Sequence, residues 1–183
     1  MNIVLTGMPA SGKSAAARAL KNTIKKYKHY DLADTDKIIE QTAGMTINEI
    51  FALYGEDYFR QIETYVLEEI LKKDNQIIST GGGIIKSDAN LKLIKEKSIS
   101  VYLKTDMETL IERAQKSSER PSLNNLDIEM QRTKLEMLYK ERKSRYEQAH
   151  IAVETKGLTP EQTAQAIMEQ IDEYCKRQNK STE

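Results

Sequence analysis

The feature that most constrains this chain is the octapeptide GMPASGKS at residues 7–14. It fits the pattern G-x-x-x-x-G-K-[ST], with an apolar run at residues 2–6 before it and a helical pattern at 14–27 after it. A strand, a glycine-rich loop and a helix in that order are the context of a phosphate-binding loop. We therefore expect the backbone amides of residues 10–15 to face a phosphate at the positive end of the helix dipole.

The side chains of this loop indicate which phosphate compound it binds. Lys13 can reach the β- and γ-phosphates of a nucleoside triphosphate, and the Ser14 hydroxyl can coordinate Mg²⁺. Regulatory GTPases normally also carry Asn-Lys-x-Asp, whereas Asn179-Lys180 is followed here by Ser181 and Thr182. The sequence therefore predicts a nucleoside triphosphate site that is not that of a regulatory GTPase.

Short apolar runs alternate with helical patterns along the rest of the chain, which favours a parallel sheet covered by helices on both faces. We expect strands at residues 2–6, 31–34, 76–80, 99–103 and 151–154. We expect helices at residues 14–27, 38–50 (two, broken near Gly44), 56–73, 91–94, 107–115, 128–149 and 160–177. No linker or repeat divides the chain, so residues 1–183 are predicted to form one α/β domain. Ligands of such sheets bind beyond the carboxyl ends of the strands.

Two carboxylates follow the second predicted strand, in the run Asp34-Thr35-Asp36. One of them can hold Mg²⁺ through water, because Mg²⁺ keeps much of its hydration shell. The other can accept the proton of an attacking hydroxyl. The alternative is that Asp36 only caps a helix that starts at Lys37.

Four arginines stand out, because a guanidinium offers a rigid fork that fits a carboxylate or a phosphate. Arg60 has Glu63 three residues later, which can hold its fork in place. Arg120 lies in the polar segment 116–127, which we expect to be a mobile loop. Arg142 and Arg145 lie one turn apart on the long late helix. Each of these could instead be a solvated surface charge.

Three consecutive glycines, Gly81, Gly82 and Gly83, follow the third predicted strand. Glycine allows a substrate to approach the backbone closely, although a tight strand-to-helix turn would also use it. From the residues alone, the sequence predicts a phosphotransferase whose acceptor is small, hydroxylated and anionic.

These motifs together resemble the shikimate kinase family over nearly the whole chain. The matching segments are GMPASGKS at 7–14, DTD at 34–36, INEIF at 47–51, GEDYFRQIE at 55–63, STGGG at 79–83 and ERPSL at 119–123. The resemblance implies transfer of the ATP γ-phosphate to the 3-hydroxyl of shikimate, giving shikimate 3-phosphate and ADP on the route to chorismate and the aromatic amino acids. It also implies the three-layer α/β/α fold of nucleoside monophosphate kinases, with a five-stranded parallel sheet, a substrate-binding helical region at about 34–75 and a mobile lid at about 116–127.

The resemblance also implies roles for single residues, position by position. Asp36, Lys13 and Arg120 would be catalytic, with Asp36 as the base. The nucleotide-binding residues would be Ala10, Ser11, Gly12, Lys13, Ser14, Ala15, Arg113, Arg120 and Pro160. The substrate-binding residues would be Asp36, Arg60, Gly81, Gly82, Gly83 and Arg142, with Phe51 and Phe59 lining the pocket. Ser14 and Asp34 would hold Mg²⁺, with ATP as the co-substrate. Ser144 stands where the family often has proline, which leaves the choice between Arg142 and Arg145 open.

Composition restricts the remaining possibilities. Lys and Arg number 28, and so do Asp and Glu, so the formal net charge of zero argues against a nucleic-acid binder that works by bulk charge. The mean hydropathy of −0.62 and the lack of a long apolar run argue against a membrane span. A single cysteine, Cys175, favours a reducing compartment, so we expect a cytoplasmic protein. We also expect a monomer whose partners are small-molecule substrates. Two alternatives stay open: a kinase for gluconate or a nucleoside monophosphate, and a nucleotide-binding switch without acceptor chemistry.

Overall fold

The computed structural model describes residues 1–25, 28–116 and 127–180, and its centre is a five-stranded sheet whose paired strands are all parallel. The strand order is β2-β3-β1-β4-β5. The strands are β1 (Asn2–Thr6), β2 (Asp31–Asp34), β3 (Gln76–Ser79), β4 (Ser98–Lys104) and β5 (Ile151–Glu154). Register places Val4 of β1 between Ile78 of β3 and Ser100 of β4. The predicted parallel sheet is confirmed, with strand ends within one residue of the expected positions.

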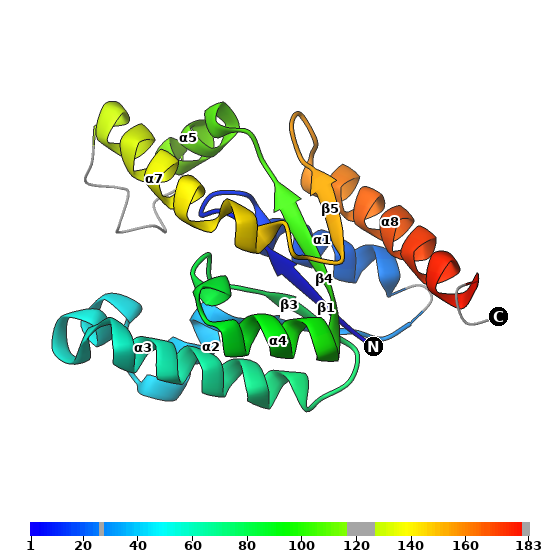
Figure 1. Ribbon diagram of the computed structural model, residues 1–183, viewed down its shortest axis with the longest axis horizontal. Helices are drawn as coiled ribbons and strands as arrows, with labels where there is room; N and C mark the ends of the chain where they lie inside the picture. The colour runs from blue at the N-terminus through cyan, green and yellow to red at the C-terminus, as the bar shows by residue number, and fades with distance from the viewer. Residues whose placement is uncertain (26–27, 117–126, 181–183) are drawn as a thin grey trace.

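Helices cover both faces of the sheet, because successive side chains of each strand point to opposite sides. On one face, Ile3 and Leu5 of β1 pack with Leu20 and Ile167, in the core formed with α1 (Lys13–Ile24) and α8 (Pro160–Lys180). On the other face, Val4 belongs to a core formed with the remaining helices. These are α2 (Thr35–Ala43), α3 (Ile47–Leu71), α4 (Asp88–Lys97), α5 (Met107–Lys116) and α7 (Ile128–Tyr146). The result is the predicted three-layer α/β/α fold (Figure 1).

The region between β2 and β3 differs from the prediction in where its helices start and end. The helix α2 begins at Thr35 rather than near residue 38, because the Asp34 side chain caps it by accepting from the Lys37 amide. The chain breaks at Gly44 as predicted, in a left-handed conformation with φ 67°. A capping box formed by Thr46 and Glu49 then starts α3. The backbone of Gly55 leaves helical geometry inside α3, with φ 79° and ψ 177°, so the predicted separate helix from residue 56 corresponds to the part of α3 after this kink.

The carboxyl ends of the strands share one edge of the sheet, and the loops that follow β1 and β3 therefore meet there. In Figure 1 the arrowheads of β1 and β4 point to the side where the blue loop after β1 lies, with α3 below it and α7 running diagonally past it. The loop after β3 passes through the three glycines into a short 3₁₀ helix, η1 (Ile84–Lys86), which the sequence did not predict. Within the described ranges, no helix is long and apolar enough to cross a membrane.

Candidate active site

The loop after β1 contains two glycines whose backbone conformations other residues rarely adopt. Gly7 has φ 149° and Gly12 has φ 88°, both in the region that favours glycine. A Cβ on Gly7 would lie 2.9 Å from the Leu103 carbonyl oxygen, so the loop packs too closely against β4 for any side chain. Ala10 adopts φ 66°, and the Ser11 amide donates to the Met8 carbonyl over 3.1 Å. The buried Ser11 hydroxyl finds no hydrogen-bond partner among the described residues.

Lys13 and Arg113 both lie against this loop. The buried Lys13 ammonium group donates to the carbonyl oxygens of Gly7 and Met8, each over 2.9 Å. Arg113 of α5 donates to the Ser11 carbonyl over 3.1 Å. Pro160 is exposed at the first residue of α8, and its predicted contact with adenine stays a prediction.

A cluster of oxygen atoms lies beside the loop, at the start of α1 and the ends of β2 and β3. The Ser14 hydroxyl donates to the Asp34 carboxylate over 3.0 Å and lies 3.0 Å from the Ser79 hydroxyl. All three groups are hard oxygen ligands, the type that Mg²⁺ prefers, so the donor set fits this ion. The sequence did not single out Ser79, although its place at the carboxyl end of a strand was a usable signal.

Asp36 lies in the first turn of α2, against the backbone of Gly81. A Cβ on Gly81 would come within 2.5 Å of the Asp36 carboxylate oxygen, so a glycine is required for this approach. The buried Thr35 hydroxyl accepts from the Gly81 amide over 3.0 Å and fixes the two segments together. The helix cap here is Asp34, and the alternative that Asp36 caps a helix starting at Lys37 is wrong.

Arg60 is held by two carboxylates of its own helix. Its NH1 group donates to Glu63 over 2.7 Å, and its Nε and NH2 groups donate to Glu56 over 3.2 and 3.0 Å. Burial lowers the pKa of Arg60, but Glu63 and Glu56 outweigh it and hold that pKa above its ordinary value. Burial raises the pKa of Glu63, the Arg60 guanidinium opposes this, and the charge of Asp36 adds to it. The predicted pairing of Arg60 with Glu63 is confirmed.

The glycine triplet connects Arg60 to the late helix α7. A Cβ on Gly83 would lie 2.7 Å from both terminal nitrogens of Arg60. The Gly82 carbonyl accepts from Arg142 NH1 over 3.2 Å and from the Tyr146 hydroxyl over 2.5 Å. Side chains of α2, α3 and α7 therefore all contact the glycine triplet at the end of one strand.

Tyr146 is a site-forming residue that the sequence did not identify as such. Its ring is fully buried and stacks on Tyr102, with 5.1 Å between the ring centroids. Burial raises the pKa of Tyr146 to about 12, so the phenol remains a donor to Gly82 at neutral pH. Nothing in its sequence neighbourhood separated it from an ordinary helix contact.

The two candidate late arginines point to different places. Arg142 is nearly buried, with 11% of its side chain exposed, and bonds to Gly82, whereas its Nε atom has no hydrogen-bond partner within the described structure. Arg145 donates to the Ile85 carbonyl over 3.0 Å and to Asp88 over 2.7 Å, and so ties α7 to α4. The geometry favours Arg142 as the arginine that faces the glycine triplet. Arg120 and most of the predicted lid lie outside the described residues.

The two predicted pocket aromatics pack on each other at the start and middle of α3. The ring centroids of Phe51 and Phe59 are 4.7 Å apart, and Phe59 is buried while Phe51 is partly exposed. The Arg60 guanidinium carbon lies 5.0 Å from the centre of the Phe59 ring, within the range of a cation–π contact. This part of the site could therefore bind a small acid, with the Arg60 guanidinium contacting its carboxylate and the Phe51 and Phe59 rings contacting its carbon ring.

Comparisons with known proteins agree with this geometry. A family model described as shikimate kinase matches residues 9–172. A shikimate kinase of Clostridium botulinum (strain 657 / Type Ba4) is 44% identical over 154 residues, covering 83% of this chain and 86% of the relative. A shikimate kinase of Thermodesulfovibrio yellowstonii is 34% identical over 181 residues, covering 99% of both chains. The solved structure of a shikimate kinase from Acinetobacter baumannii in complex with shikimate superimposes with a TM-score of 0.84 and 33% identity, covering 93% of this chain and 92% of that one.

Proposed function

This chain belongs to the shikimate kinase family, and on that premise we propose that it transfers the γ-phosphate of ATP to the 3-hydroxyl of shikimate. The products are shikimate 3-phosphate and ADP, on the route to chorismate. The observation that carries the proposal is the meeting of four features at one sheet edge: the phosphate loop, Asp36, Arg60 and Arg142.

The acceptor's carboxylate is the part of shikimate that this site is best suited to hold. Arg60 and Arg142 come from α3 and α7 and approach the glycine triplet from two sides. A guanidinium fork pairs with a carboxylate through two parallel hydrogen bonds. With the carboxylate bound there, the acceptor's hydroxyl groups face Gly81 and Asp36, toward the phosphate loop.

Asp36 acts on the acceptor hydroxyl. Its carboxylate accepts the proton as the hydroxyl oxygen attacks the γ-phosphorus and ADP leaves. The hydrogen bond from the Gly81 amide to the Thr35 hydroxyl fixes the backbone next to Asp36, and so fixes the position of this carboxylate. Good orientation of two reactants can lower a barrier by roughly 7–11 kcal/mol, which makes positioning the main task of these residues.

Lys13 and the amides of residues 10–15 neutralise charge on the phosphates. To do so, Lys13 exchanges its present bonds to the Gly7 and Met8 carbonyls for phosphate oxygens. Ser14 and Asp34, with Ser79 beside them, would hold Mg²⁺, which supplies electrostatic stabilisation of the transferring group. Arg120 would add a further positive charge from the lid, and Arg113 and Pro160 would contact the adenine.

A coupled assay of ADP release tests the proposal. We expect ADP formation to require both shikimate and Mg²⁺, and gluconate and nucleoside monophosphates not to replace shikimate. The proposal would be refuted if the rate of ADP release did not depend on shikimate, or if it depended on gluconate or a nucleoside monophosphate instead. Gel filtration of the same preparation tests the further expectation that the protein is a monomer.

A further inference from the structure

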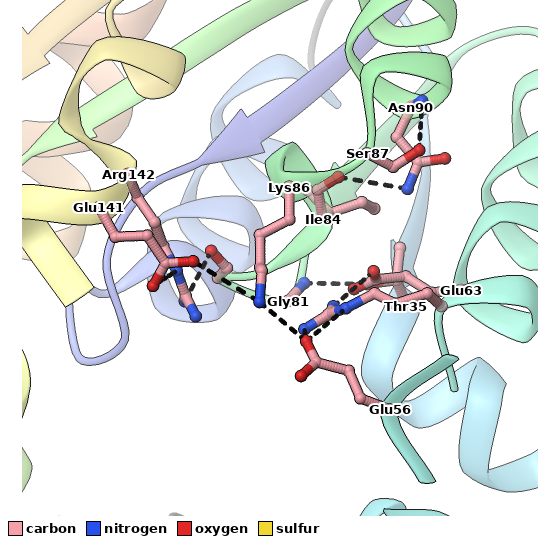
Figure 2. Close-up of polar contacts among 12 residues, drawn as sticks. Thr35, Glu56, Glu63, Gly81, Ile84, Lys86, Ser87, Asn90, Glu141 and Arg142 are labelled. Atoms are coloured by element: carbon pink, nitrogen blue, oxygen red, sulfur yellow. Dashed lines mark hydrogen bonds and ion pairs between the residues drawn. The ribbon is translucent and has the colours of Figure 1, made fainter. Parts of the chain in front are cut away.

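Lys86 lies between two carboxylates at the side of the candidate acceptor site. It is the last residue of η1, three positions after the glycine triplet. Its ammonium nitrogen lies 2.9 Å from Glu56 of α3 and 3.5 Å from Glu141 of α7. Figure 2 shows Lys86 reaching between these two side chains, with Arg142 beside Glu141.

Each of these carboxylates also contacts one of the two arginines of the site. One oxygen of Glu56 accepts from Lys86 and from two nitrogens of Arg60. The second carboxylate, Glu141, has its Oε2 atom 3.9 Å from the Nε atom of Arg142. Charges of alternating sign therefore run from Arg60 through Glu56, Lys86 and Glu141 to Arg142, and connect α3 to α7 across η1.

These five alternating charges affect the positions of the two arginines more than they affect the stability of the fold. Lys86 is 34% exposed and both glutamates are 48% exposed, so solvent screens each pair and its contribution to folding is small. Hydrogen bonds from Lys86 and Arg60 lower the pKa of Glu56, so this carboxylate stays ionised at neutral pH. Without Lys86, the carboxylates of Glu56 and Glu141 would lose the positive charge between them. The glutamate beside each arginine would then be held less firmly.

We propose that Lys86 is a positioning residue that sets the separation of Arg60 and Arg142, and thereby the fit of the acceptor's carboxylate between them. The proposal rests on the proposed function, because it assigns the carboxylate of shikimate to these two arginines. Lys86 lies outside the glycine and arginine motifs from which the acceptor site was predicted.

The test compares Lys86→Met with Lys92→Met, a matched loss of a lysine on α4, where Lys92 is 75% exposed and pairs only weakly with Glu96. We expect Lys86→Met to raise the KM for shikimate about tenfold, with kcat and the KM for ATP within about threefold of wild type. Lys92→Met should change neither constant. Lys86→Arg should restore most of the affinity, because it keeps the charge between the glutamates.

Two further measurements separate positioning from direct binding or a folding defect. With shikimate methyl ester as acceptor, Lys86→Met and wild type should differ little, because the ester lacks the carboxylate charge. Glu141→Gln should raise the KM for shikimate, whereas a lysine that binds the substrate directly would be released by this change and the KM would fall.

An unchanged KM in Lys86→Met, an equal loss with the ester, or a lower KM in Glu141→Gln would each overturn the proposal. The activity of the wild-type protein on shikimate tests the proposed function separately from the role of Lys86. If the wild type phosphorylates shikimate and these variants behave otherwise than expected, only the role of Lys86 is wrong.

Discussion

Replacing Gly83 with alanine tests whether the position of Arg60 determines acceptor binding. The Gly83 backbone has φ −98° and ψ −5°, which alanine adopts without strain. Its new Cβ would lie 2.7 Å from Arg60 NH1 and NH2, whereas ordinary contacts begin at 3.4 Å. The guanidinium must therefore move by about 0.7 Å, the difference between these two distances. Glu63 and Glu56 pair with the same guanidinium, so the movement disturbs both ion pairs.

This displacement should weaken the use of shikimate without unfolding the protein. A misplacement of about 1 Å can cost on the order of 100-fold in rate, so we expect kcat/KM for shikimate to fall by about 10- to 100-fold in Gly83→Ala. The KM for ATP should stay within about twofold of wild type, because the phosphate loop is unchanged. Thermal unfolding should show a stability within about 1 kcal/mol of wild type, since the gain of about 0.4–1 kcal/mol from Gly→Ala at a compatible backbone offsets part of the cost of displacing Arg60.

Gly44→Ala is the matched control. Gly44 has φ 67° with no atom within 4 Å of an added Cβ, so alanine there strains the backbone without touching the site. We expect it to lower the unfolding free energy by about 1 kcal/mol and to leave the KM for shikimate unchanged. A wild-type kcat/KM in Gly83→Ala would refute the reasoning, because the clash would then have no consequence for the acceptor.

Three other substitutions test separate parts of the site. Asp36→Asn should lower kcat by about 10²–10⁴-fold with ATP binding unchanged, and turnover close to wild type would exclude Asp36 as the base. Arg60→Ala should weaken shikimate binding by about 2–5 kcal/mol in a calorimetric titration, and an unchanged affinity would remove Arg60 from the acceptor site. Tyr146→Phe removes a hydrogen bond to Gly82 and should cost about 1 kcal/mol in urea unfolding. Since burial raises the pKa of Tyr146 from 10.0 to about 12, its phenol contributes fully below pH 10 and loses that contribution as the pH rises toward 12. Wild-type stability should accordingly fall more steeply than that of Tyr146→Phe over this pH range.

The sequence predicted the sheet well because buried parallel strands are short, continuous apolar runs. Residues 2–6 and 76–80 were visible in this way, and each ends at a glycine-containing loop. The helix boundaries were harder, because they depend on caps formed by side chains. Asp34 serves both as the cap of α2 and as the partner of Ser14, and a pattern of apolar spacing contains neither contact.

The candidate site was predictable wherever one motif contains the interacting groups. Arg60 and Glu63 share one helix turn, so their pairing followed from spacing alone. Tyr146 and Gly82 are 64 positions apart, and only the folded chain brings them together. Lys86 belongs to the same group, because its two glutamate partners come from helices before and after it in the chain.

The most direct test of the account is a crystal structure of the wild-type protein with shikimate and Mg²⁺·ADP. We predict the carboxylate of shikimate between Arg60 and Arg142, and its 3-hydroxyl within hydrogen-bond distance of Asp36 on the side of the phosphate loop. Shikimate bound with its carboxylate away from both arginines, or with its 3-hydroxyl directed away from the nucleotide, would contradict the account.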